Sequence, residues 1–149
     1  MIVPSVPPLR SVPVVPIVSR FKKLQPYPRS LGAVSCTGFS EAKKRFGLYV
    51  LDYMVTSNHV HLLVKETGGD VIAQSMQLIA GRIAQEYNQG KNRHGAFWED
   101  RYHATAIEDD EHLHRCLVYI DLNMVRAGVV NDPAKWGYSG YREIQELRR

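Results

Sequence analysis

The clearest structural pattern in the chain lies in residues 48–64, LYVLDYMVTSNHVHLLV. Two runs of aliphatic, β-branched and aromatic residues, 48–55 and 59–64, flank the turn-forming residues 56–58. Such runs are typical of β-strands, and a short polar turn between them favours an antiparallel hairpin. The sequence therefore predicts an antiparallel sheet, which other parts of the chain have to cover.

Patterns typical of helices follow the hairpin. Residues 71–88 and 109–123 each repeat apolar side chains at spacings of three and four, which indicates helices with one buried face. Residues 103–107 predict a third strand, residues 133–138 a turn or short helix, and residues 139–149 a last helix. A hairpin followed by helices and a further strand predicts an α+β fold, with helices packed on an antiparallel sheet.

Residues 1–40 differ from the rest in composition. Seven of the eight prolines lie in the first 28 residues. Proline lacks a backbone donor, so we expect residues 1–40 to form an irregular, poorly ordered arm with one short strand near 17–21. The globular domain is then expected over residues 41–149, beginning with the end of a short helix that stops at Gly47.

Charge is unevenly distributed along the chain. Residues 1–50 carry eight basic residues and one acid, a net +7, whereas residues 51–149 carry eleven basic and fourteen acidic residues, a net −3. The whole chain therefore has a net charge of +4. A basic arm suggests a polyanionic partner, but from charge alone a solvated basic tail is slightly favoured.

Length and composition restrict the class of protein. The 149 residues suffice for one domain with a hydrophobic core. Two cysteines are too few for a disulfide framework, so we expect a reduced, cytoplasmic setting. No apolar run approaches the roughly 18 residues of a membrane span. The apolar stretch 12–18 is short and contains two prolines, so we do not interpret it as a signal peptide.

His59 and His61 form the first candidate site. Alternate residues of a strand point to one face, so the two imidazoles are expected side by side, with Val60, Leu62 and Val64 facing a core. Two adjacent imidazoles can bind one metal ion. Two surface histidines on an edge strand are the alternative interpretation of this short pattern.

Tyr119 and Asn123 form the second candidate site. On a continuous helix these two residues share a face, within a polar stripe that also holds Arg115 and Arg126. Tyr119 is a candidate nucleophile, and the Asn123 amide oxygen is a candidate ligand for the same metal. The alternative is a half-buried tyrosine that serves only in packing.

Aromatic and basic residues in the segment 97–103, FWEDRYH, suggest contact with nucleic acid. Aromatic rings can stack on unpaired bases, and arginine can bind phosphate. A strand that anchors its aromatic residues in the core is an equally good interpretation. The candidate DNA-binding residues of the whole chain are Arg93, Trp98, Arg101, Tyr102, Arg115 and Arg126.

Four segments together resemble one protein family. They are MVTSNHVHLLV (54–64), FWEDRYHA (97–104), YIDLNMVRAG (119–128) and WGYSGY (136–141). In this order they resemble the motifs of the single-tyrosine HUH transposases, in which HUH denotes histidine, a hydrophobic residue and histidine. The most similar branch is that of the REP-associated tyrosine transposases, which are related to the insertion sequence 200 type. The resemblance covers about residues 41–146.

The resemblance implies a fold, a site and a reaction. The implied fold is a ferredoxin-like sheet covered by helices. Tyr119 corresponds to the nucleophile, His59 and His61 to metal ligands, and Asn123 to the polar residue that completes the metal site. The implied metal is Mg²⁺ or Mn²⁺, and two imidazoles with one amide oxygen suit Mn²⁺ better.

The implied substrate is single-stranded DNA with a hairpin beside the cleavage site, as at REP-like or insertion-sequence ends. Tyrosine attack leaves a 5′-phosphotyrosine link and a free 3′-hydroxyl, and reversal of the step joins a new strand. A monomer or a homodimer is compatible with the sequence. Such a protein is expected in the cytoplasm, associated with the nucleoid when it is bound to DNA.

Some expected family features are missing from the sequence. The first strand and helix of the family are not recognisable in residues 1–40, where residues 17–20 are the best candidate for the strand, and Met124 replaces a proline. We therefore expect both ends to be incomplete and the histidine strand to lie beside an open edge. Two alternatives follow, a catalytically decayed remnant that only binds DNA hairpins and an unrelated histidine-metal hydrolase.

Overall fold

The computed structural model describes residues 13–21, 29–56, 58–92 and 94–147. The first six elements alternate in the order strand, helix, strand, strand, helix, strand, and short helices follow. The elements are β1 (Val14–Arg20), α1 (Arg29–Phe46), β2 (Tyr49–Val55), β3 (His59–Lys65), α2 (Val71–Gly90), β4 (His103–Ala104), α3 (Asp110–Asp121), α4 (Asn123–Arg126), the 3₁₀ helix η2 (Pro133–Lys135) and α5 (Tyr141–Leu147).

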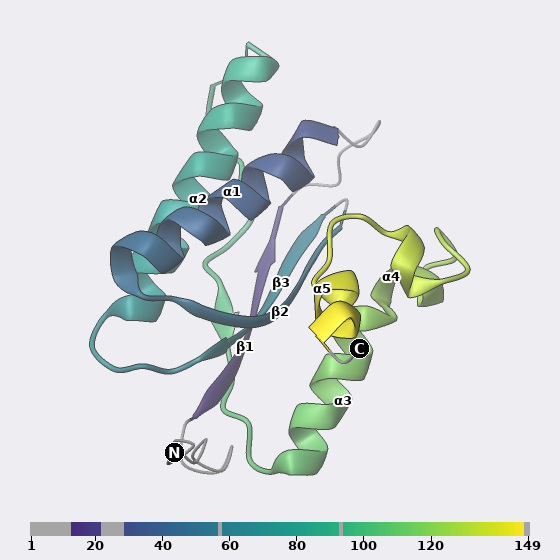
Figure 1. The fold of residues 1–149 in the computed structure, drawn as a ribbon. Helices are drawn as coiled ribbons and strands as arrows, with labels where there is room; N and C mark the ends of the chain where they lie inside the picture. Colours follow the sequence, from purple (N-terminus) through teal and green to yellow (C-terminus); the bar gives the residue numbers. More distant parts are fainter. Residues whose placement is uncertain (1–12, 22–28, 57, 93, 148–149) are drawn as a thin grey trace.

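The four strands form one antiparallel sheet in the order β2-β3-β1-β4 (Figure 1). The predicted hairpin is confirmed, with Met54 opposite His61 and Val55 opposite Val60. This order and this succession of elements are those of the ferredoxin-like fold. The α+β class and the ferredoxin-like architecture expected from the sequence are therefore both correct.

Residues 14–20 of the expected irregular arm form a regular strand, which is longer than the short strand expected near 17–21. These residues form β1, which pairs with β3 along its whole length, from Val14 opposite Lys65 to Arg20 opposite His59. The histidine strand therefore lies between two strands rather than beside an open edge. Residues 1–12 and 22–28 of the expected arm lie outside the described residues.

Pro16 is tolerated in β1 because of the side to which its backbone faces. In an antiparallel strand the N–H and C=O of one residue point to the same neighbour. The Pro16 carbonyl accepts a hydrogen bond from Thr105 N at 3.3 Å, on the side of the two-residue strand β4. The missing N–H therefore costs no bond to β3, and proline does not prevent a strand here.

Residues 29–40 also depart from the expected arm. They form the first part of α1, and only the end of this helix was predicted. The helix stops where the sequence indicated, before Gly47, which has a positive φ of 75°. The proposed boundary at residue 40 falls inside α1, so it does not separate an arm from a domain.

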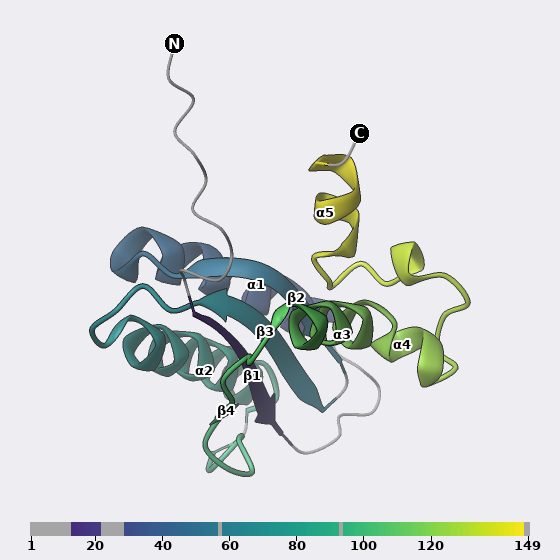
Figure 2. The same cartoon turned by 90° about the horizontal axis from the view of Figure 1, so that it is seen from below.

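The helices cover both faces of the sheet (Figures 1 and 2). On one face α1 and α2 pack side by side, and their core includes Ile17, Leu62 and Ile79. On the other face α3 and α4 pack through Ile120 and Met124 against Met54 and Leu63 of the sheet. The side chains of β1 and β3 alternate between these two cores.

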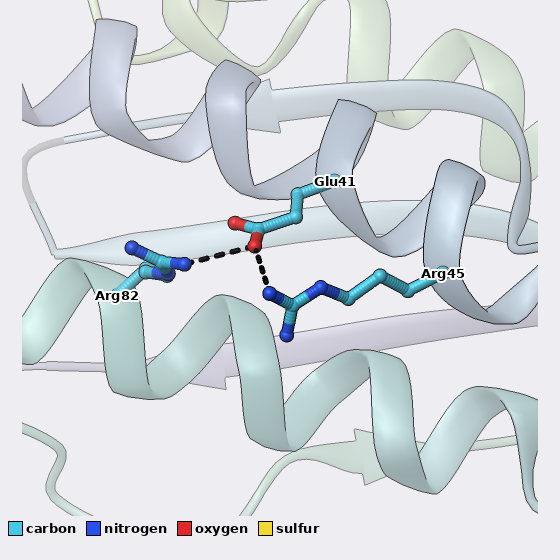
Figure 3. A network of polar contacts seen from close by, with 3 residues as sticks. All are labelled: Glu41, Arg45 and Arg82. Carbon is cyan, nitrogen blue, oxygen red and sulfur yellow. Dashed lines mark hydrogen bonds and ion pairs between the residues drawn. The ribbon is translucent and has the colours of Figure 1, made fainter.

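An ion-pair network joins α1 to α2 on the outer side (Figure 3). The Glu41 carboxylate accepts a hydrogen bond from Arg82 of α2 at 2.8 Å and pairs with Arg45 of its own helix at 3.0 Å. Because these groups are partly exposed, the network contributes at most about 1 kcal/mol. The two-helix layer is held mainly by its apolar core.

The later elements are shorter than the sequence indicated. The third strand was expected over 103–107, but only residues 103 and 104 form β4. The helix expected over 109–123 ends at Asp121, and α4 begins at Asn123. None of the helices among the described residues combines the length and the apolar character needed to cross a membrane.

Candidate active site

The two histidines of β3 lie side by side on the face of the sheet that α3 covers. Their rings are stacked, with centroids 5.5 Å apart and planes 25° from parallel. His61 is 7% exposed and His59 is half-buried. Val60 lies between the two histidines and Leu62 follows them, and both side chains face the opposite core, as the alternation of the strand predicted. The arrangement expected for the histidine pair is therefore confirmed.

Tyr119 of α3 comes to the same place. Its ring lies edge-on to the His61 ring, with centroids 6.0 Å apart and planes at 70°. The tyrosine is 49% exposed, so solvent and a large substrate can reach it. Tyrosine and histidine thus meet within one chain, although 58 positions separate them in the sequence.

A pocket of about 600 Å³ opens at this contact. His61 and Tyr119 both line it, and Pro16 and Val18 of β1 form part of its wall. A second hollow of about 390 Å³ lies between α1, β2 and α5 and contains none of the candidate site residues. Of the candidate catalytic and metal-binding residues, His61 and Tyr119 therefore line the first pocket, whereas His59 and Asn123 do not.

The environment keeps both imidazoles neutral. Burial, with the neighbouring His59 as a smaller cause, lowers the pKa of His61 from 6.5 to about 4. Burial and the Arg20 guanidinium also lower the pKa of His59, against a smaller opposing effect of Glu99. A neutral imidazole has a free nitrogen lone pair, which is the form that binds metal ions.

Arg20 and Asn58 orient the His59 ring. Arg20 Nε donates a hydrogen bond to His59 Nε2 at 3.1 Å, and His59 Nδ1 lies 2.7 Å from Asn58 Oδ1. Arginine can only donate, so Nε2 is the acceptor and Nδ1 carries the proton that Asn58 accepts. The nitrogen available for a metal is therefore Nε2, and Arg20 occupies its lone pair here.

The donor set fits a divalent metal in part. Two neutral, adjacent imidazoles are suitable nitrogen ligands for an ion such as Mn²⁺. Among the described residues no third histidine, cysteine, aspartate or glutamate joins them. Asn123, the expected third ligand, opens α4 instead of continuing α3, and no contact of its side chain with either imidazole is found in the described residues. Its ligand role stays a prediction.

The arginines of the tyrosine region lie as the polar stripe suggested. Arg115 and Arg126 both line the pocket, and the Arg126 guanidinium lies 5.5 Å from the centre of the Tyr119 ring. Arg101 is exposed on the loop before β4. Arg93, also a candidate DNA contact, lies outside the described residues.

The aromatic candidates for DNA contact are largely engaged in packing. Trp98 is half-buried, its ring lies edge-on to Phe21 and Phe97, and its Nε1 donates to Ala80 O at 3.0 Å. Tyr102 packs at the border of the same core. Of the two interpretations of segment 97–103, packing accounts for these contacts, and a DNA role for either residue stays a prediction.

Sequence analysis missed Arg20 and Asn58 as residues of the site. Asn58 was assigned only to the turn before β3, and Arg20 to the short strand expected near 17–21 within the arm. The pairing of that strand with β3 was not predicted, so nothing in the sequence placed Arg20 beside the histidines. Only the register of β1 against β3 places it opposite His59.

Comparisons with known proteins relate the chain to one family and one fold. A family model described as "Transposase IS200 like" matches residues 33–123. A solved REP-associated tyrosine transposase bound to a REP hairpin superposes with a TM-score of 0.75 at 14% identity, over 88% of this chain and 78% of that chain. A candidate transposase from Deinococcus radiodurans R1 superposes with a TM-score of 0.52 at 16% identity, over 73% and 88% of the two chains.

At these identities the solved structures show the fold alone. No curated protein sequence matches the chain. The family assignment therefore depends on the family model, which covers more than half of the chain.

Proposed function

The chain belongs to the IS200-like transposase family, and from this we propose that it cuts and rejoins single-stranded DNA with Tyr119 as the nucleophile. The observation that carries the proposal is the edge-on contact of the Tyr119 and His61 rings at the mouth of one pocket. It brings a solvent-accessible phenol beside a pair of neutral imidazoles.

In the proposed reaction the Tyr119 oxygen attacks a phosphodiester phosphorus. The new bond joins the phenol oxygen to phosphorus, and the bond from phosphorus to the 3′-oxygen breaks. The phenol proton leaves and the released 3′-oxygen takes up a proton, which gives a 5′-phosphotyrosine link and a free 3′-hydroxyl. Arg126 beside the ring and Arg115 at the pocket are placed to stabilise negative charge on the phenolate and the phosphate.

We assign His59 and His61 as ligands of a divalent metal, Mg²⁺ or Mn²⁺, and Asn123 as the third ligand. Such an ion would polarise the scissile phosphate. Arg20 has to leave His59 Nε2 when a metal binds, because both require the same lone pair. The side chain is exposed, so it can turn toward a phosphate of the incoming strand.

The proposed substrate is a single strand with a hairpin beside the cleavage site. The structurally similar REP-associated enzyme is bound to a REP hairpin. In this chain the proposed DNA contacts are Arg101, Arg115 and Arg126, with Arg93, Trp98 and Tyr102 as further candidates. A chromosomal substrate implies a cytoplasmic protein associated with the nucleoid.

One ground for the decayed-remnant alternative, the missing first strand, does not hold, because β1 lies in the centre of the sheet. The adduct experiment below decides between cleavage and hairpin binding alone. The unrelated hydrolase is incompatible with the family match over residues 33–123.

The experiment is to incubate the protein and Mn²⁺ with end-labelled, hairpin-flanked single strands, with and without EDTA. We expect a covalent protein–DNA adduct from the wild type, and no adduct from Tyr119→Phe, because phenylalanine has no attacking oxygen. Tyr87→Phe, on α2 and outside the pocket, is the matched control and should still form the adduct. DNA that is bound but uncut across candidate hairpins would refute the proposed reaction and leave hairpin binding alone.

A further inference from the structure

The tyrosine helix packs over one part of the histidine face of the sheet. It contacts β2 and β3, through a core that contains Ile120 and Leu63. Strand β1 lies on the other side of β3. Val18 of β1 pairs with His61, so Val18 and the alternate residue Pro16 point to the same face as the histidines. The pocket of about 600 Å³ opens between this part of β1 and α3.

The walls of this pocket are mainly apolar and aromatic. Pro16 and Val18 of β1 line one side and are half-buried. Cys116 and Tyr119 line it from α3, where residues three positions apart share one side of the helix. Nucleic-acid bases outside a duplex are bound by apolar and aromatic side chains that contact the faces of the ring. The walls therefore suit a flat, uncharged ring.

The charged residues at the pocket favour an anionic ligand. Arg115 and Arg126 line it and are exposed, and none of the described lining residues is acidic. Arginine binds phosphate oxygens through paired hydrogen bonds. The volume lies within the range of about 300–1,000 Å³ that is usual for ligand pockets. Apolar walls together with two arginines match a nucleotide, which joins a flat base to a phosphate.

The pocket begins at the proposed nucleophile. Tyr119 and His61 both line it, and their ring centroids lie 6.0 Å apart. Successive phosphates of a DNA strand are joined by a single nucleoside. A phosphate held at the Tyr119 hydroxyl therefore brings a neighbouring base to the pocket, provided that this base is not paired with another strand.

We propose that this pocket holds one unpaired base of the DNA strand, next to the phosphate that Tyr119 attacks, while Arg115 and Arg126 bind phosphates of the same strand. The position beside the attacked phosphate rests on the proposed function, whereas the binding of an unpaired base does not. A base within a duplex is excluded, because it is already stacked and paired.

The chain carries a reporter for this pocket and a matched control. Cys116 lines the pocket, whereas Cys36 lines the hollow between α1, β2 and α5. Both thiols are free and half-buried, and burial raises the pKa of each. Alkylation by N-ethylmaleimide, measured for each cysteine by peptide mass spectrometry, therefore shows whether DNA covers one place and not the other.

The probe is a single-stranded oligothymidylate of about twelve nucleotides, within the usual site size. The protein is Tyr119→Phe, which keeps the ring but cannot form an adduct. At saturation we expect alkylation of Cys116 to slow about tenfold or more, and that of Cys36 to change less than about twofold. An abasic strand of the same length and charge, and a duplex with oligoadenylate, should leave Cys116 reactive.

A second measurement connects the pocket with cleavage by the wild type. In a hairpin-flanked strand that forms the adduct, loss of the base at one of the two positions beside the cut should slow adduct formation about tenfold or more at saturation, because the bound base positions the phosphate. An abasic site about six nucleotides from the cut is the control and should change the rate less than about twofold.

Each result supports or overturns the proposal. Unchanged alkylation of Cys116 in oligothymidylate at about 1 mM, above the usual Kd of about 10⁻⁴–10⁻⁶ M for non-specific binding, refutes the binding of a base. Equal protection by the abasic strand shows a phosphate site alone, and equal slowing at Cys36 shows a general effect on the fold. Both outcomes contradict the proposal.

The remaining outcomes separate the pocket from the reaction. Protection of Cys116 together with cleavage that tolerates an abasic site at both positions beside the cut refutes the place of the base beside the attacked phosphate. Absence of an adduct in the wild type refutes the proposed function, and the alkylation comparison still decides whether the pocket binds an unpaired base.

Discussion

Arg20 and His59 lie opposite each other on β1 and β3, and their hydrogen bond fixes which imidazole nitrogen carries the proton. Asn58 supports the same tautomer from the other side of the ring. His59 is therefore neutral and held in one orientation, and its Nε2 atom accepts a hydrogen bond from the Arg20 guanidinium. At the scale of single residues, the Arg20 contact therefore competes with the proposed metal for the lone pair of His59 Nε2.

Replacing Arg20 with alanine should strengthen metal binding. The variant frees His59 Nε2 and removes a positive charge beside the ligands. A hydrogen bond to a charged group contributes about 1.5 kcal/mol, which corresponds to roughly a tenfold change in Kd. Titration of the DNA-free protein with Mn²⁺, followed by electron paramagnetic resonance or calorimetry, measures this change in the Kd for Mn²⁺.

Arg101→Ala is the matched control for this titration. It removes the same charge from an exposed arginine on the loop before β4 and should leave the affinity for Mn²⁺ nearly unchanged. Weaker binding of Mn²⁺ by Arg20→Ala would show that Arg20 supports the metal site and does not compete with it.

Strand β1 is the element in which the structure differs most from the expectation based on the sequence. The run VVPIVSR combines β-branched residues with a proline, and the proline content of its surroundings led to the expectation of an arm. In the structure its inner residues, such as Ile17 opposite Leu62, fill the core under α1 and α2. Its outer residues Val18 and Arg20 border the histidines. One strand thus supports the core and the site together.

Truncating Ile17 to alanine should destabilise the whole fold. The side chain is 1% exposed, and removal of such a buried aliphatic group costs about 3 kcal/mol. Urea unfolding followed by circular dichroism measures the change. Val129→Ala, at a residue that is 55% exposed, should cost less than about 0.5 kcal/mol. Equal, small effects of both variants would show that residues 14–20 do not belong to the core.

Two buried groups give the whole molecule opposite dependences of stability on pH. Folding lowers the pKa of His61 from 6.5 to about 4. Between these two pH values the unfolded chain binds a proton at this residue and the folded protein does not. The stability of the fold therefore decreases as the pH falls through this range. The pKa of Asp52 is raised, so its contribution to stability is lost as the pH rises toward its folded-state value. The two effects partly cancel in mildly acidic solution.

Replacing His61 with glutamine should remove one of these dependences. Between pH 7 and pH 4 the wild type should lose about 3 kcal/mol more stability than His61→Gln, the equivalent of a shift from 6.5 to about 4. Urea unfolding of both proteins in EDTA at several pH values tests this. Parallel curves of stability against pH would contradict the neutral, buried state of His61.

The sequence by itself determined the hairpin, the outward pair His59 and His61, and the helix that carries Tyr119, because these depend on local periodicity. It indicated only a short strand near 17–21 and not the full β1 or its pairing with β3. Whether a strand tolerates a proline depends on which neighbour the proline backbone faces, and only the assembled sheet decides that. Nor did the sequence reveal the contact of Arg20 with His59. These residues are 39 positions apart, and only the register of β1 against β3 brings them together.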